Sequence, residues 1–346
     1  MKSENLKRYS FGLLIITVLS IIALAIGESS RGGCFALEAD SGAKSSSAVE
    51  PGALDSARLL SATINRIGRL QSISAEISLK MTLFDEEYVG GGRYEELAAP
   101  KNRRSAGGFD PLTTSQFRLH IKMSPPPSAA LTQEIDDNVL EIVCDQNSLW
   151  TYTSIEGEQR LTEINLTEMA GYLGQLNDAE REKLTASGVT FPASMGNFPA
   201  LGGVAGTLVS LENWYDFDPV PAKIFFNAGT FPVWKITGRM KPERLESARK
   251  KLTGGDCPPG DARTAHLPDG VEIYIGQKTP FPFRIVYFSV TNEEKELHKP
   301  LVTLDFTRVY ENVTSVKGSN FIYAPKINFD RITKPYLQQL IPGVEL

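Results

Sequence analysis

The chain has 346 residues, of which 41% are hydrophobic, and a formal net charge of −5. This length is sufficient for one large domain or two small ones. An acidic chain is poorly suited to bind the phosphate backbone of nucleic acids or to adhere to anionic lipid by charge. We therefore expect no nucleic-acid partner.

The N-terminus has the pattern of a secretory signal. Basic residues precede residues 11–27, an uncharged and mostly apolar run of 17 residues. This length is near the lower limit for a membrane-spanning helix, so a cleaved signal and a retained N-terminal anchor both remain open. The small residues Ala25 and Gly27 favour cleavage before Glu28. In either case we expect export to the periplasm or the cell envelope.

Residues 28–51 are rich in Ser, Gly and Ala and show no periodicity, so we expect a disordered tether. Cys34 leaves lipidation as a third fate of the N-terminus, although Arg31 stands where a lipidation signal needs an aliphatic residue. Removal of residues 1–27 takes away three positive charges and one negative charge, which changes the net charge from −5 to −7.

The cysteines leave two alternatives open. In an oxidising compartment, Cys144 and Cys257 could form a disulfide. Cys144 also lies on the apolar face of a predicted strand, where a buried thiol packs as a small hydrophobic side chain.

Hydrophobic periodicity gives the first elements. Apolar residues recur every three or four positions in residues 57–70, which predicts an amphipathic helix. Every odd position of residues 72–83 is apolar and every even one is polar, which predicts a strand with one buried and one solvated face. The three glycines at 90–92 interrupt the next strand pattern and predict a bulge or a sharp bend.

Further strands are predicted at 116–123, 139–145, 149–153 and 160–166, with a turn at 145–147. Strands that are apolar on one side only imply antiparallel pairing, because parallel sheets are covered on both faces. The apolar face of such a sheet must be covered, and helices are the candidates.

The rest of the chain mixes helices and strands. We expect helices at 166–176, 178–184, 201–214, 241–253 and 335–340, and a loop at 187–200. Strands are expected at 233–240, 271–275, 283–290, 301–310 and 321–323. Without an internal repeat or a convincing linker, residues 52–346 are predicted to form a single domain with helical insertions at about 167–232 and 241–269.

Residues with catalytic or metal-binding potential do not form a recognisable pattern. The three histidines are far apart and lack the spacing of metal ligands, and Asp216 with Asp218 is too small a set of carboxylates for a metal site. We therefore expect no enzymatic activity, no metal and no cofactor. An extracytoplasmic hydrolase is the third of three hypotheses, and it requires a histidine and a nucleophile brought together by the fold.

The segment 201–217 carries more apolar and aromatic residues than its neighbours. Val204, Leu208, Leu211 and Trp214 recur at helical spacing and share one face. Ordinary packing of a core helix is one interpretation of this face. The other is a lid that covers an apolar cavity.

The order of several motifs resembles the LolA-like superfamily, which includes the periplasmic lipoprotein carriers. Residues 143–152 (VCDQNSLWTY) resemble a hairpin of that family, and the strand 116–123 precedes them in the same order. Residues 282–287, 303–306 and 320–325 are similar to its closing strands. The resemblance covers roughly residues 54–330. The chain departs from the pattern at Asn147, which replaces a turn glycine, and in its two insertions.

The resemblance implies an α+β, mostly β fold, in which a curved antiparallel sheet forms a half-open barrel and helices cover its concave apolar face. It also implies binding of lipid or lipoprotein acyl chains. We expect a monomeric, non-enzymatic protein, with membrane-bound envelope proteins as further partners. The alternative is an envelope interaction or sensor protein that uses the same fold without cargo. Combined with the patterns above, the predicted cavity and lid residues are Ile77, Leu79, Leu119, Ile121, Val204, Leu208, Leu211 and Trp214.

Overall fold

The computed structural model describes residues 55–83, 86–98, 115–124, 138–155, 157–177, 180, 203–226, 231–253, 267–292 and 297–340. The predicted signal or anchor, the tether with Cys34, the loop 187–200 and Cys257 lie outside the described residues, as does nearly all of the predicted helix 178–184.

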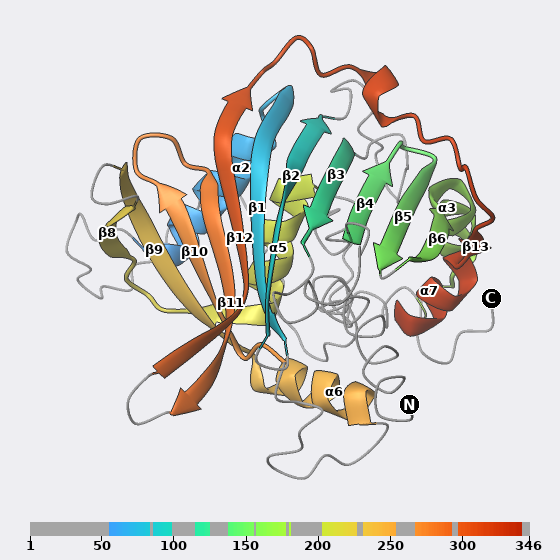
Figure 1. Cartoon of the computed structure of the whole chain (residues 1–346). Coiled ribbons are helices and arrows are strands. Elements are labelled where there is room, and N and C mark those ends of the chain that lie inside the picture. The colour runs from blue at the N-terminus through green and yellow to red at the C-terminus, as the bar shows by residue number, and fades with distance from the viewer. Residues whose placement is uncertain are drawn as a thin grey trace, which may run out of the picture.

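The described strands form one sheet of thirteen strands (Figure 1). They are β1 (Ser72–Leu83), β2 (Glu86–Leu97), β3 (Gln116–Met123), β4 (Asn138–Cys144), β5 (Ser148–Ile155), β6 (Glu158–Asn165), β7 (Tyr215–Phe217), β8 (Ala222–Phe226), β9 (Phe231–Met240), β10 (Gly270–Gly276), β11 (Pro282–Asn292), β12 (Leu297–Glu311) and β13 (Asp330–Arg331). The helices are α2 (Ser56–Ile67), α3 (Leu166–Gln175), α5 (Gly203–Trp214), α6 (Pro242–Thr253), the 3-10 helix η5 (Gly318–Phe321) and α7 (Thr333–Leu340).

The sheet consists of two meanders that meet at its centre. The strand order is β13-β6-β5-β4-β3-β2-β1-β12-β11-β10-β9-β7, and β8 also pairs with β9. All pairs are antiparallel except β13 with β6. The mostly β, mostly antiparallel prediction is therefore confirmed. The sheet is neither closed nor strongly curled, and the half-open barrel remains a prediction.

Strand β1 has the predicted alternation. Its odd positions from Ile73 to Met81 are only 2–7% exposed. On the other face Glu76 and Lys80 are exposed, but Ser72 and Ser74 at the start of the strand are buried as well. β1 pairs with β12 across a register shift between Ser74 and Glu76, where Arg308 adopts a positive φ of 46°. The side-chain period of two thus placed the apolar residues of this strand on one face, as expected.

The predicted bulge at the three glycines is wrong. Strand β2 runs through Gly90, Gly91 and Gly92 with an uninterrupted register to both β1 and β3. The reason for glycine here is a close approach of backbones: a Cβ on Gly92 would lie 1.8 Å from the carbonyl oxygen of His120. A Cβ on Gly90 would lie 2.9 Å from that of Lys122.

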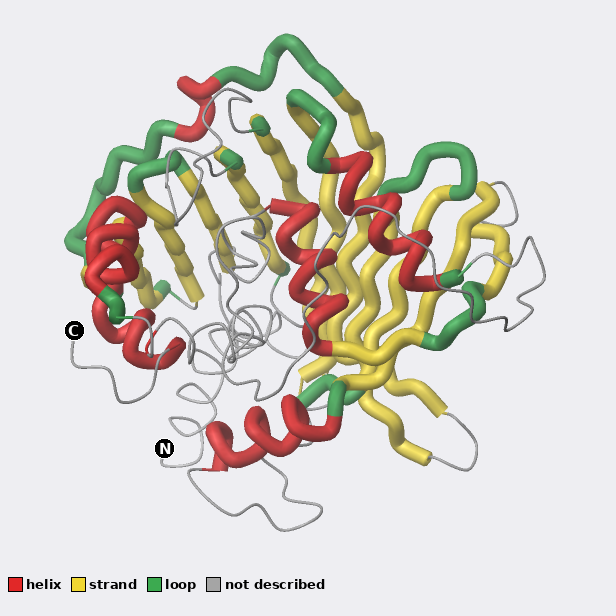
Figure 2. The backbone as a smooth tube through the Cα atoms, turned by 180° about the vertical axis from the view of Figure 1, so that it is seen from behind, coloured by secondary structure: helices red, strands yellow, loops and turns green. Residues whose placement is uncertain are grey.

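Helices α2 and α5 lie on the same face of the sheet, which is called the inner face below (Figure 2). The Asp55 side chain caps α2 by accepting from the amide of Ala57, and Asn165 caps α3 by accepting from that of Glu168. Both are residues that N-caps favour, because a short side-chain oxygen satisfies an amide that has no partner within the helix.

The predicted helices at 241–253 and 335–340 are confirmed as α6 and α7.

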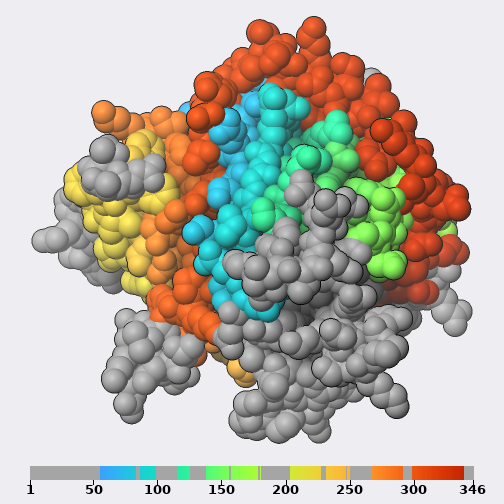
Figure 3. All heavy atoms as spheres, viewed as in Figure 1, coloured from blue at the N-terminus to red at the C-terminus, as the bar shows by residue number. Residues whose placement is uncertain are grey.

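The opposite, outer face carries a second, smaller core that the alternation did not predict. Its buried residues are Val143, Trp150, Leu161, Val316 and Phe321. The last two come from the segment 312–332, which follows β12 and runs along the rim of the molecule to β13 (Figure 3). The strand predicted at 321–323 is wrong, because this segment forms η5 and an irregular chain.

Two local predictions concern β4 and the turn that follows it. Cys144 is fully buried in the inner-face core, as expected of a small hydrophobic side chain, and its pairing with Cys257, which lies outside the described residues, remains a prediction. In the turn that follows, Gln146 and not Asn147 adopts the left-handed conformation, with φ 75°. The Asp145 carboxylate supports this turn by accepting from the amides of Asn147 and Ser148. Among the described residues, no helix has the length and apolarity required to span a membrane.

Candidate apolar binding site

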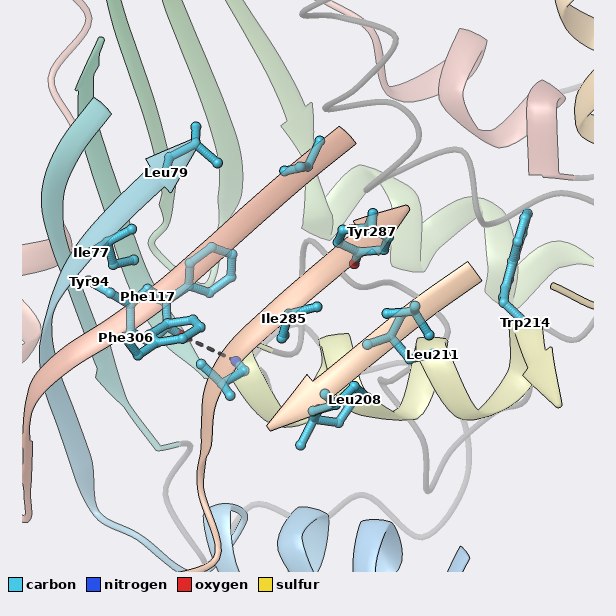
Figure 4. Packing of buried hydrophobic residues seen from close by; sticks show 14 of the residues in the cluster. Ile77, Leu79, Tyr94, Phe117, Leu208, Leu211, Trp214, Ile285, Tyr287 and Phe306 are labelled. Carbon is cyan, nitrogen blue, oxygen red and sulfur yellow. Dashed lines mark hydrogen bonds between the residues drawn. The ribbon is translucent and has the colours of Figure 1, made fainter. Parts of the chain in front are cut away.

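The eight residues predicted for the cavity and lid come together in one apolar cluster on the inner face. Seven of them are buried, and Leu119 is half-buried and packs against the others. They come from β1, β3 and α5, which are far apart in the sequence. Figure 4 shows Leu208 and Leu211 on α5 near Ile285 and Tyr287 of β11. As contacts of an acyl chain, these residues remain a prediction.

Helix α5 is buried on two sides. Val204, Leu208 and Leu211 form one side, and Leu208 is completely inaccessible. Gly206 and Ser210 lie on another side and are also buried. The helix contacts α2, and the Ser61 hydroxyl of α2 hydrogen-bonds the Glu212 side chain of α5. The two helices therefore form a connected cover over the inner face.

Aromatic side chains line the part of the cluster nearest the start of α5. The Tyr94 ring lies edge-on to Phe306, with centroids 6.0 Å apart, and near Phe117 at 6.4 Å (Figure 4). Phe281 packs edge-on against Phe306 at 5.7 Å. The sequence interpretation missed Tyr94, Phe281 and Phe306 as members of this cluster. For Tyr94 a signal was present, since even positions of β2 share a face.

The C-terminal end of α5 is tied to the sheet. The helix continues directly into β7, where Tyr215 pairs with Met240 of β9. The backbone amide of Lys241 donates to the carbonyl of Trp214, and its ammonium donates to that of Asn213 at 3.0 Å. A cation at a helix C-terminus is also favoured by the helix dipole.

A buried polar group lies at the N-terminal end of α5. The Tyr94 hydroxyl donates to Glu96 Oε2 at 2.6 Å, and the amide of Val204 donates to the Tyr94 oxygen at 3.1 Å and to Glu96 Oε2 at 3.3 Å. Burial is the main cause that raises the pKa of Tyr94 well above its usual value, and the charge of the neighbouring Glu96 raises it further. Burial likewise raises the pKa of Glu96, against the effect of its hydrogen bonds. The sequence interpretation did not single out Glu96, although its even position places it on the inner face.

Two further tyrosines bring hydroxyl groups into the apolar cluster. Tyr215 of β7 and Tyr287 of β11 are both buried, and burial raises the pKa of each phenol. These groups stay neutral at physiological pH. Among the described residues, the cluster is thus an apolar surface that carries neutral hydroxyl groups and the Glu96 carboxylate.

The described residues do not assemble a metal site, since no three side chains of the ligating types gather there. His120 is partly exposed and lies 3.7 Å from Glu141. His298 contacts Glu272 at 3.2 Å and stacks on Phe288. His266 lies outside the described part of the chain.

Several solved structures are similar to this chain. The MucA/MucB complex of Pseudomonas aeruginosa contains a chain with 12% identity and a TM-score of 0.32, which matches 77% of this chain and 61% of its own length. LprF from Mycobacterium bovis has 9% identity and a TM-score of 0.34, over 75% of this chain and 95% of its own. A LolA superfamily protein from Nitrosomonas europaea has 9% identity and a TM-score of 0.25, over 78% and 99%.

This chain spans about three fifths of the matched chain in the MucA/MucB complex. No family model matches the chain, and no curated protein matches it.

Proposed function

We propose that this chain is a non-enzymatic protein of the cell envelope that binds lipid or lipoprotein acyl chains between α5 and the inner face of the sheet. In this proposal the sheet acts as a half-open barrel, α5 acts as its lid, and the predicted signal in residues 1–27 directs the chain to export. Carriage of lipid between membranes would follow from reversible binding at this site.

The observation that supports the proposal is the composition of the surface that α5 covers. It joins residues of β1, β3, β11 and α5 into one apolar cluster, with the Tyr94–Glu96 pair at the N-terminal end of the helix. Each CH₂ group that leaves water contributes about 0.8 kcal/mol, so partial burial of two acyl chains is enough for useful affinity.

One observation favours the alternative of an interaction or sensor protein without cargo. The described members of the inner-face cluster pack against one another, and Leu208 is 0% exposed. An acyl chain could therefore reach the apolar cluster only after α5 has moved away from the sheet. A protein that never exchanges α5 for a ligand would have the same packing.

A matched pair of truncations tests the proposal. Leu208 lies in the inner-face cluster and Leu161 in the outer one, and both are buried. Either change to Ala removes similar core volume and should cost about 2–5 kcal/mol of unfolding free energy. We expect Leu208→Ala to weaken the binding of a fluorescent fatty acid several-fold and Leu161→Ala to leave it unchanged, measured at a temperature where both variants are folded.

Mass spectrometry of organic extracts from the purified protein identifies cargo that it has retained. Acyl lipids at a defined ratio to the protein would agree with the proposal. If the wild type binds no acyl probe and retains no lipid, the acyl-binding proposal is wrong and the interaction-protein alternative takes its place. If both truncations weaken binding of the probe equally, the proposed binding site between α5 and the sheet is wrong.

A further inference from the structure

The two ends of α5 are held in different ways. Its C-terminal end continues into the β7–β9 ladder and is fixed by Lys241. Its N-terminal end, within the part of the chain that the structure describes, is held by the side chains of Tyr94 and Glu96 of β2. A motion that uncovers the inner face would therefore pivot at the C-terminal end and release the N-terminal one.

The contact at the N-terminal end is close. Gly203 has φ 58°, and a Cβ at this position would lie 2.5 Å from the Glu96 carboxylate. Tyr94 and Glu96 both accept from the amide of Val204, and Tyr94 donates to Glu96. The first turn of α5 thus rests directly on the carboxylate, without an intervening side chain.

Among the described residues, the groups that hydrogen-bond Glu96 are neutral. They are the Tyr94 hydroxyl on its own strand, the Ser115 hydroxyl before β3 and the Val204 amide of α5. The Cys144 sulfur of β4 lies near Tyr94. No cationic side chain of the described residues pairs with Glu96, which is only 6% exposed. An ionised carboxylate that is buried without a cation destabilises the arrangement that buries it, and the helix dipole offsets only part of that cost.

We propose that Tyr94 and Glu96 form a pH-dependent latch, in which a protonated Glu96 holds the first turn of α5 on the sheet and an ionised Glu96 lets it lift. The inference rests on the proposed function in that α5 is taken to be a lid. It concerns how access to the apolar cluster is regulated, and it names no further ligand.

The direction of the effect follows from proton linkage. Burial raises the pKa of Glu96 in the closed arrangement, whereas water would solvate the carboxylate once the turn has lifted. The closed arrangement therefore binds the proton more tightly than the open one. Its extra stability is complete below the ordinary carboxyl pKa and is lost as the pH rises through the raised pKa of Glu96.

Hydrogen–deuterium exchange of the full chain without added lipid tests the latch. The exchange rate of the amides at residues 204–208 is compared between the wild type and Glu96→Gln at each pH, so that the intrinsic pH dependence of exchange cancels. Gln keeps the shape and an acceptor oxygen but cannot ionise. We expect equal rates near pH 4 and several-fold faster exchange in the wild type near pH 7.5.

Glu95→Gln is the matched control, because Glu95 lies next in sequence and forms an ion pair with Arg93, away from α5. It should leave the wild-type pH dependence unchanged. Should Glu96→Gln fail to fold, Tyr94→Phe serves instead: it removes a donor to the carboxylate and should move the onset of fast exchange to higher pH. A wild type that exchanges at the rate of Glu96→Gln at every pH would overturn the latch.

Binding of a fluorescent fatty acid by the same proteins separates this inference from the proposed function. If Glu96→Gln slows release of the probe and removes the pH dependence of its release, the latch controls access to the site. A pH-dependent exchange difference without any probe binding would support the latch and contradict the acyl-binding function. Probe binding together with equal exchange rates would support the acyl-binding function and contradict the latch.

Discussion

At the scale of single residues, the strand β2 depends on the absence of side chains at its glycines. Gly92 faces the backbone of His120, and a carbonyl oxygen in a strand ladder cannot move aside as a flexible side chain can. We expect Gly92→Ala to lower the free energy of unfolding by about 1–3 kcal/mol or more, as is usual for overpacked positions. Urea unfolding with an unchanged m value would measure this loss.

Gly171 provides the control for this prediction. It lies in α3, and a Cβ there would meet no atom within 4 Å. Gly171→Ala should therefore raise stability by up to about 1 kcal/mol, through the better helix propensity of alanine. Equal unfolding midpoints for the two variants would show that the close approach of β2 to β3 does not explain the glycines.

At the scale of elements, α5 is positioned by its ends as much as by its apolar side. Lys241 holds the last turn of the helix through the carbonyl of Asn213 and through its charge. Lys241→Ala should cost about 1 kcal/mol and speed amide exchange in the last turn of α5, since both the hydrogen bond and the dipole interaction are lost.

Lys223 is the comparison for this change, because it is an exposed lysine on β8. Its replacement by Ala should leave the exchange of α5 at the wild-type rate. If the amides in the last turn of α5 exchange at the same rate in both variants, the pairing of β7 with β9 is sufficient to fix this end of the helix.

At the scale of the whole molecule, the segment 312–332 connects the centre of the sheet to its β6 edge and covers the outer core. Phe321 is completely buried in that core, whereas its neighbour Ile322 is 73% exposed. Phe321→Ala should cost about 3–5 kcal/mol, because a large buried ring is lost. Ile322→Ala should change stability by less than about 0.5 kcal/mol.

Thermal and urea unfolding of these two variants measure how much the outer core contributes to the free energy of unfolding. A loss of stability in Phe321→Ala that leaves fatty-acid binding intact would separate the outer core from the candidate site on the inner face. Similar stabilities of the two variants would mean that the segment 312–332 does not contribute to the core.

The sequence alone determined the strands β1 and β3, the antiparallel pairing and the apolar side of α5. These features depend on side-chain periodicity, which is a property of neighbouring residues and does not need the rest of the fold. It also placed all eight candidate residues in what proved to be one cluster, because residues of equal parity on paired strands share a face.

Only the tertiary structure decided what lies opposite each of these faces. The carbonyl of His120 on the next strand explains why position 92 is a glycine. The partner of the buried Glu96 carboxylate is the first turn of α5, more than 100 residues away. The outer core required Phe321 to reach Trp150 and Leu161 from the far end of the chain. Such contacts depend on which segments the fold brings together, and periodicity within one segment carries no information about its partner.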